Sequence, residues 1–129
     1  MENLKEGYPV RKFQGATKRF CQTLDLRNDP ELISEYRRLH SHEGIWQETL
    51  DAIRSAGVLE MEIYILGTRL FMICELPAEL AWDDVMNRMA SMPRQAEWEA
   101  LTARYQQAAA GAKSDEKWQL MERIFHVYE

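Results

Sequence analysis

The sequence contains few cysteines, glycines and prolines, and this excludes several classes of protein. It has 129 residues, of which 6 are Gly and 4 are Pro, too few for a collagenous or low-complexity chain. Its two cysteines, Cys21 and Cys74, lie far apart and without CxxC spacing, so we predict neither a disulfide framework nor a zinc cluster. This use of cysteine fits a reducing compartment, and we expect a cytoplasmic protein.

Long apolar runs and an excess of positive charge are also missing. The most apolar stretch, Met61 to Leu76, is interrupted by Glu62, Arg69 and Glu75 and is too short to span a bilayer. The N-terminus has no apolar region typical of a secretory signal. The 16 Lys and Arg are outnumbered by 21 Asp and Glu, giving a net charge of −5, which disfavours binding to a phosphate backbone. We therefore expect neither a membrane nor a nucleic acid as partner.

The remaining composition is that of an ordinary globular protein. The chain is 46% hydrophobic and 29% charged, and its length matches one domain with a substantial core. Residues 1–16 show no periodic pattern, and we expect an irregular N-terminal arm. Residues 17–129 are expected to form a single domain.

The first part of this domain predicts one strand and then two helices. Lys18–Leu26 alternates between apolar and polar residues, as a strand does. Asp29 can cap a helix whose first turn contains Pro30. A polar segment, Ser41–Gly44, separates that helix from a second one, which ends before Gly57, where a left-handed residue is favoured.

Two alternating runs, Val58–Leu66 and Arg69–Leu76, predict a β-hairpin. They are joined by Gly67-Thr68, and such a two-residue loop pairs Leu66 with Arg69. In this register one face is wholly apolar: Leu59, Met61, Ile63, Ile65, Leu70, Met72, Cys74 and Leu76. The other face is too apolar for a solvated sheet surface, and we expect it to contact a partner subunit: Glu60, Glu62, Tyr64, Phe71, Ile73 and Glu75.

The last part of the chain predicts further helix and a final strand. Trp82–Met89 favours a short helix, Pro93 interrupts it, and Arg94–Ala109 favours a longer helix that ends near Gly111. Arg123–Tyr128 alternates weakly, as a short final strand would. The resulting order, βαββαβ, is the ferredoxin-like plan of the α+β class. Its four-stranded antiparallel sheet has helices on one face and leaves the other for a partner.

The candidate chemistry lies on the first helix, since the sequence has no glycine-rich phosphate loop, GxSxG or HExxH motif. Tyr36 and His40 are four residues apart, so their polar tips can converge on one ligand. Histidine can give and take a proton near neutral pH. Alternatively, the pair is only the amphipathic edge of a core helix. His42 points to another side and no third ligand is near, so no metal site is predicted.

Other polar and aromatic residues give weaker signals. His126, on the expected final strand, fits a partly buried structural histidine, although it could reach a pocket from the sheet. Glu60 and Glu62 could be proposed as paired carboxylates, but they should lie on the opposite face of the sheet from His40. The four tryptophans fit either core packing or an apolar wall for a sugar ring: Trp46, Trp82, Trp98 and Trp118.

Over residues 18–128 the sequence resembles the L-rhamnose mutarotase family. The resemblance is a scattered pattern of residues in the right order and spacing, without one diagnostic motif. It consists of Glu35-Tyr36-Arg37-Arg38-Leu39-His40, Ile45-Trp46, Gly57, Ile63-Tyr64, Leu70-Phe71, Glu75, Trp82 and Trp98.

This resemblance implies an epimerase without a cofactor, acting at the anomeric carbon of a 6-deoxy-L-hexose. It also implies a homodimer of ferredoxin-like subunits, a dimeric α+β barrel. The proton-donating histidine of the family falls on His40 and a substrate-binding tyrosine on Tyr36. A second tyrosine and a pair of tryptophans fall on Met61 and on Glu97 with Trp98, so two of these substrate-binding positions differ from the family. L-rhamnose and L-fucose are both candidate substrates.

The residues themselves are sufficient for this chemistry. Interconversion of α and β pyranoses takes a proton from the anomeric hydroxyl and gives one to the ring oxygen, so one acid and one base suffice. Neither a metal nor a cofactor is needed. Two other functions stay open: a cofactor-independent monooxygenase or haem-handling protein with the same dimeric fold, and a non-catalytic sugar-binding module.

Overall fold

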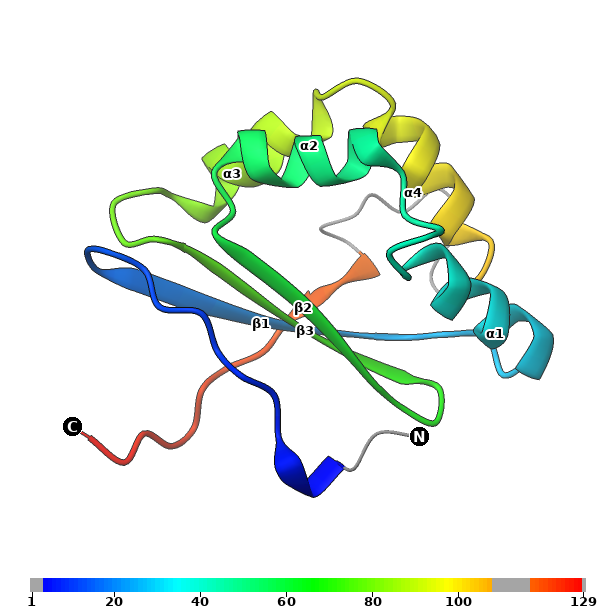
Figure 1. Cartoon of the computed structure of the whole chain (residues 1–129), viewed down its shortest axis with the longest axis horizontal. Helices are drawn as coiled ribbons and strands as arrows, with labels where there is room; N and C mark the ends of the chain where they lie inside the picture. Colours follow the sequence, from blue (N-terminus) through cyan, green and yellow to red (C-terminus); the bar gives the residue numbers. More distant parts are fainter. Residues whose placement is uncertain (1–3, 108–116, 129) are drawn as a thin grey trace.

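The computed structural model describes residues 4–107 and 117–128 and confirms the predicted α+β fold. Four antiparallel strands form one sheet in the order β2-β3-β1-β4, which is the ferredoxin-like order. The helices cover one face of this sheet (Figure 1). In chain order the strands and α-helices are β1 (Thr17–Asp25), α1 (Pro30–Leu39), α2 (Gln47–Ala56), β2 (Glu60–Leu66), β3 (Arg69–Pro77), α3 (Trp82–Ala90), α4 (Gln95–Ala103) and β4 (Gln119–Leu120).

The boundaries of α1 and α2 follow the predicted capping residues. Asp29 Oδ1 accepts hydrogen bonds from the backbone N–H groups of Glu31 and Leu32, at 2.9 and 3.3 Å. Helix α2 ends at Gly57, whose φ of +111° is left-handed. A Cβ at this position would also lie 2.8 Å from Leu80 Cδ1, so both the backbone conformation and the available space favour glycine.

The hairpin has the predicted register, which places its apolar face under the helices. Leu66 pairs with Arg69, and Met61 pairs with Cys74. Side chains of β3 on this face are buried in two adjoining core clusters: Leu70, Met72, Cys74 and Leu76. The face of the sheet that carries the candidate site is therefore the one predicted.

The prediction that the last helix runs from Arg94 to Ala109 is wrong, because α4 ends at Ala103. Backbone groups just after it bind instead to the end of β1: the Arg27 N–H donates to the Tyr105 carbonyl at 2.9 Å. The Gln107 N–H likewise donates to the carbonyl of Asp25 at 2.8 Å. These bonds replace continued helix, and the predicted positions 108 and 109 lie outside the described residues.

The prediction of a final strand at Arg123–Tyr128 is also wrong. The fourth strand is the short β4, whose residues pair with Gln22 and Thr23 of β1. The chain then leaves the sheet, and residues 121–128, here called the C-terminal tail, are exposed and not in a strand. The tail's larger apolar side chains are among the most exposed large hydrophobic side chains of the described residues: Ile124 at 90%, Phe125 at 77%, Val127 at 68% and Tyr128 at 82%.

Both ends of the described chain lie on the side of the sheet away from the helices. Residues 4–16 form an N-terminal arm that contains one 3-10 turn, Leu4–Glu6. Figure 1 shows the arm, in dark blue, and the tail, in orange to red, below the sheet. Among the described residues, no helix has the length and apolar character needed to cross a membrane.

Candidate functional site

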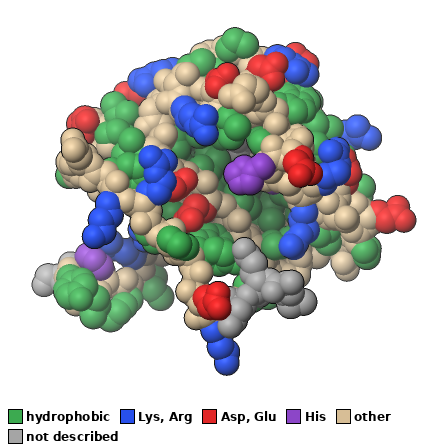
Figure 2. All heavy atoms as spheres, in the orientation of Figure 1, with side chains coloured by type: hydrophobic (Ala, Val, Ile, Leu, Met, Phe, Trp, Pro, Cys, Tyr) green, Lys and Arg blue, Asp and Glu red, His purple; other side chains and the backbone are tan. Residues whose placement is uncertain are grey.

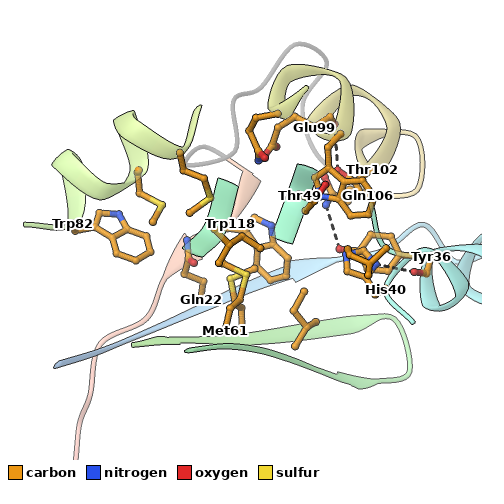
Figure 3. A pocket seen from close by; sticks show the side chains of 18 residues that line it. Gln22, Tyr36, His40, Thr49, Met61, Trp82, Glu99, Thr102, Gln106 and Trp118 are labelled. Carbon is orange, nitrogen blue, oxygen red and sulfur yellow. Dashed lines mark hydrogen bonds between the residues drawn. The ribbon is translucent and has the colours of Figure 1, made fainter. Parts of the chain in front are cut away.

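An inner cavity of about 100 Å³ lies between the helices and the apolar face of the sheet. Its floor comes from the strands and includes Gln22, Met61 and Met72, while its walls come from all four α-helices. Figure 3 shows Tyr36 and His40 at one side of this cavity and Trp82 at the other. The remaining lining combines apolar side chains with a set of polar ones: Gln22, Thr49, Gln95, Glu99, Thr102 and Gln106.

Tyr36 and His40 lie next to each other at the cavity, as their four-residue spacing predicts. Their rings are stacked, with centroids 4.3 Å apart and an interplanar angle of 31°. His40 Nδ1 lies 2.8 Å from the Tyr36 carbonyl oxygen. A carbonyl only accepts, so Nδ1 carries the hydrogen and the neutral ring has its Nε2 lone pair free. Burial lowers the pKa of His40 below its ordinary value, which favours this neutral form.

The Tyr36 phenol keeps its proton at neutral pH. Burial raises the pKa of Tyr36 to about 12, which outweighs a lowering effect of its hydrogen bond from Gln106. Gln106 Nε2 donates to the Tyr36 oxygen at 3.5 Å, so the phenol O–H itself can donate to a ligand. The two neighbouring side chains thus offer a free base, the His40 imidazole, and a protonated donor.

Trp98 and Met61, two of the predicted substrate-binding residues, also line the inner cavity. The Trp98 ring lies edge-on to the ring of His40, with centroids 5.4 Å apart, and to the ring of Trp46, at 5.2 Å. Met61 lies on β2, on the floor of the cavity. The structure therefore brings four predicted residues together: Tyr36, His40, Met61 and Trp98.

Glu97, the fifth predicted residue, does not line the cavity, so its contact with a sugar stays a prediction. It is exposed on α4, where Arg94 Nε lies 3.3 Å from its carboxylate. Two residues further on, Glu99 is the carboxylate that lines the cavity. Successive helix positions are rotated by about 100°, so a shift of two positions moves a side chain to another face.

The sequence analysis missed the polar residues that accompany Glu99. Gln95 Nε2 donates to Glu99 Oε1 at 3.0 Å. On the other side, the Nζ of buried Lys117 lies 3.6 Å from Glu99 Oε2. The spacing of Gln95, Glu99 and Thr102 is i, i+4, i+7, which predicts a common helix face. This polar stripe was the available signal, and all three of these residues line the cavity.

His42 and His126 lie outside the inner cavity. His42 lines a more polar outer cavity of about 350 Å³, together with Arg11, Arg54 and Glu60. The two cavities share His40 and Met61 among their lining residues, so they adjoin at the candidate base.

His126 was expected on a strand with partial burial, and both expectations were wrong. It lies in the exposed tail, on the side of the sheet opposite the cavity, in a groove that Arg123 also lines. In the described part of the chain no three His, Cys, Asp or Glu residues are grouped in a way that could hold a metal ion.

Comparisons with known proteins find similarity to mutarotases over most of the chain. The model of the L-rhamnose mutarotase family matches residues 19–127. An L-fucose mutarotase of Xanthomonas campestris is 37% identical over 112 residues, covering 87% of this chain and 90% of the relative. A UPF0734 protein of Dictyostelium discoideum is 34% identical over 114 residues, and the match covers 85% of this chain and 90% of that protein.

The fold is similar to that of a solved structure. It is the crystal structure of an L-rhamnose mutarotase from Formosa agariphila, with a TM-score of 0.56. The match covers 84% of this chain and 97% of the other, at 18% sequence identity. The similarity therefore extends over the whole arrangement of sheet and helices and is not confined to one motif.

Proposed function

The chain belongs to the L-rhamnose mutarotase family of isomerases, which act at the anomeric carbon of a sugar, and we propose that it interconverts the α and β anomers of a 6-deoxy-L-hexose. The observation that carries this proposal is the pairing of His40 and Tyr36 in one cavity. His40 has a free Nε2, and Tyr36 has a phenol O–H that no described residue accepts. These are the base and the donor that anomer exchange requires.

The reaction follows from the protonation states of these two groups. His40 Nε2 takes the proton of the anomeric hydroxyl as the bond between C1 and the ring oxygen breaks. The Tyr36 O–H supplies a proton to the ring oxygen, which leaves an open-chain aldehyde. Rotation about C1–C2 exposes the other face of the carbonyl, and the same steps in reverse return both protons. General acid–base catalysis of this kind contributes roughly 10²–10⁴-fold.

The comparisons favour this function over the two alternatives. The matches to mutarotases extend over nearly the whole chain, and they give no support to a monooxygenase or haem-handling protein. A non-catalytic sugar-binding module would bind the sugar without accelerating exchange, and a rate measurement separates it from an enzyme.

Saturation-transfer NMR of the anomeric protons tests the proposal directly. We expect the wild-type protein to accelerate exchange of L-fucose and L-rhamnose, and His40→Ala to lose roughly 10²–10⁴-fold of that rate. Glu97→Gln is the matched control, because Glu97 is exposed on the helix that also carries Glu99, and it should keep the wild-type rate. A folded His40→Ala protein with an unchanged rate would contradict the role of His40.

L-fucose is the substrate that we expect to be accelerated at least as strongly as L-rhamnose. The support is the relative described as an L-fucose mutarotase, at 37% identity, and the departure at Met61, where the resemblance implies a tyrosine. A strong preference for L-rhamnose in the wild-type protein would contradict this choice.

We also propose that the protein is a cytoplasmic homodimer, with the second copy covering the sheet face opposite the helices. That face carries Tyr64, Phe71 and Ile73, which alternate along the hairpin strands with the residues that face the helices. The tail and the arm extend on the same side (Figure 1), and the tail's apolar side chains are exposed (Figure 2). Leaving this apolar area in water is unfavourable. Two free thiols, at Cys21 and Cys74, fit a reducing compartment.

A further inference from the structure

Three buried polar atoms in the described part of the chain have no hydrogen-bond partner, and all three belong to residues of the inner cavity. They are Thr49 Oγ1, Gln95 Oε1 and Gln106 Oε1. The three residues are 4%, 6% and 4% exposed. A buried polar atom without a partner costs about 1–3 kcal/mol, so three in one cavity mark a place where a polar ligand completes the hydrogen bonds.

The orientation of the Gln95 amide follows from its existing bond. Gln95 Nε2 faces a carboxylate oxygen of Glu99 at 3.0 Å, and a carboxylate can only accept. Gln106 Nε2 faces the Tyr36 hydroxyl oxygen at 3.5 Å. In the structure each amide uses its N–H₂ group within the protein, and its carbonyl oxygen has no partner. The carboxylate fixes this orientation for Gln95, whereas the Tyr36 hydroxyl beside Gln106 can both donate and accept. Figure 3 shows Thr49 and Gln106 near each other, above the pair of Tyr36 and His40.

The chemistry of these atoms defines the class of ligand. Two amide oxygens can only accept hydrogen bonds, and Glu99 adds a carboxylate to the cavity wall. They require a ligand with several O–H donors, and they disfavour phosphate or carboxylate groups, which would bring further acceptors and negative charge. A neutral sugar offers one donor on each hydroxyl, and the apolar remainder of the cavity fits the methyl group of a deoxy sugar.

We propose that Thr49, Gln95 and Gln106 are specificity-determining residues, each accepting a hydrogen bond from a different hydroxyl of the sugar. This inference rests on the proposed function. Thr49 belongs to α2, Gln95 to α4, and Gln106 to the segment that bridges to Leu26. Acceptors on three separate elements distinguish sugars by the direction of each hydroxyl, and L-rhamnose and L-fucose differ in configuration at C2 and C4.

The sharpest test is Thr49→Val, which removes only the hydroxyl and keeps the shape of the side chain. Because Oγ1 has no partner without ligand, we expect the melting temperature to stay the same or rise. The dissociation constant for L-fucose, or for L-rhamnose if that sugar is preferred, should increase roughly 5- to 150-fold. The exchange rate at saturating sugar should change much less than the affinity.

Thr102→Val is the matched control for stability. Thr102 is also 4% exposed and lines the same cavity, but its Oγ1 already donates to the Glu99 carbonyl at 3.3 Å. We expect its melting temperature to fall. If Thr49→Val also lowers the melting temperature and leaves the affinity unchanged, the Thr49 hydroxyl has a structural role and the proposal is wrong.

Mono-deoxy derivatives of the preferred sugar assign each residue to a hydroxyl. Removing the hydroxyl that Thr49 recognises should weaken binding to the wild-type protein, but not weaken binding to Thr49→Val any further. Gln95→Met and Gln106→Met are compared with the deoxy sugars in the same way, as double-mutant cycles between one side chain and one hydroxyl. If no variant shows such coupling with any derivative, the proposal is overturned, even where anomer exchange is intact.

This outcome differs from a failure of the proposed function itself. Binding without accelerated exchange would contradict the mutarotase activity and leave the coupling measurable by titration. A wild-type protein that binds neither sugar at millimolar concentration would overturn the inference directly.

Discussion

A single hydrogen bond decides which nitrogen of His40 can take part in proton transfer. Its Nδ1 is held at 2.8 Å from the carbonyl of Tyr36, one helical turn earlier. The same turn that stacks the two rings therefore also selects the tautomer with Nε2 free. Burial then keeps the ring neutral by lowering its pKa, so in the proposed reaction the side chain acts first as a base and as an acid only after it has taken a proton.

The lowered pKa of His40 makes both stability and activity depend on pH. The folded protein binds this proton less readily than the unfolded chain does. The contribution of neutral His40 to stability is therefore fully present above the ordinary histidine pKa of 6.5, and it decreases as the pH falls below that value. We expect the free energy of unfolding to decrease below pH 6.5, by at most about 1.4 kcal/mol per pH unit from this group.

Urea unfolding at pH 7.5, 6.5 and 5.5 measures this effect. The His40→Ala protein should lose the decrease between pH 6.5 and 5.5, because it lacks the titrating group. The exchange rate of the wild-type protein should decline in the same direction, since protonated Nε2 cannot accept. An identical pH dependence of unfolding in both proteins would show that another group is responsible.

At the residue scale, the sequence predicted that Tyr36 and His40 lie together, which the structure confirms, but it did not predict the polar groups around them. Tyr36 and His40 share a helix, and their relative position depends only on helical geometry. Glu97 was assigned to the cavity through the resemblance alone, whereas the helical phase places Glu99 there. Gln106 follows the end of α4, so no period in the sequence places its amide beside Tyr36.

At the scale of elements, helix α1 and its C-cap residue carry the two proposed proton-transfer groups, and the start of the helix depends on one side chain. Asp29 Oδ1 accepts from two backbone N–H groups that the helix itself leaves unpaired. We expect Asp29→Ala to lower the free energy of unfolding by about 1 kcal/mol. Asp29→Asn keeps an accepting oxygen and should lower the free energy of unfolding by only a few tenths of a kcal/mol. Chemical denaturation compares the two, and equal losses in both variants would contradict the capping role.

Elements determined by local chemistry were predicted well, and elements determined by distant contacts were not. The hairpin depends on a two-residue turn and its register, both visible in the chain around Gly67. The end of α4 depends on backbone hydrogen bonds from the segment near Tyr105 to the end of β1. Helical periodicity continues through that segment in the sequence. A pattern of apolar residues does not indicate which carbonyl will accept a hydrogen bond from a given N–H, so it does not show where the helix ends.

At the scale of the whole molecule, helices cover one face of the sheet, and only irregular segments of the chain lie on the other. The helices lie on one side, and the arm and the tail pass on the other (Figure 1). Residues Arg123–Tyr128 alternate like a strand, yet their large apolar side chains are exposed. Alternation indicates that one face of a segment will be buried, but it does not indicate whether the same chain supplies the partner. This explains why a strand was predicted where the chain has an open tail.

The last prediction follows from these exposed side chains. Ile124 is 90% exposed and Phe125 is 77% exposed, and burying one such side chain contributes about 1.5–3 kcal/mol. If the tail packs on a second copy, replacing both with Asp removes about 3 kcal/mol or more, which raises the dimer dissociation constant at least roughly a hundredfold. Sedimentation velocity at micromolar concentration should show a dimer for the wild type and a larger monomer fraction for the double variant.

Leu66→Asp is the control for this experiment, since Leu66 is 86% exposed at the tip of the hairpin and outside the tail. It introduces an aspartate at a similarly exposed apolar position, and the dimer should persist. A wild-type protein that sediments as a monomer would contradict the proposed dimer. A double variant that remains as dimeric as the wild type would show that the second copy contacts the sheet face without the tail, through residues such as Phe71 and Ile73.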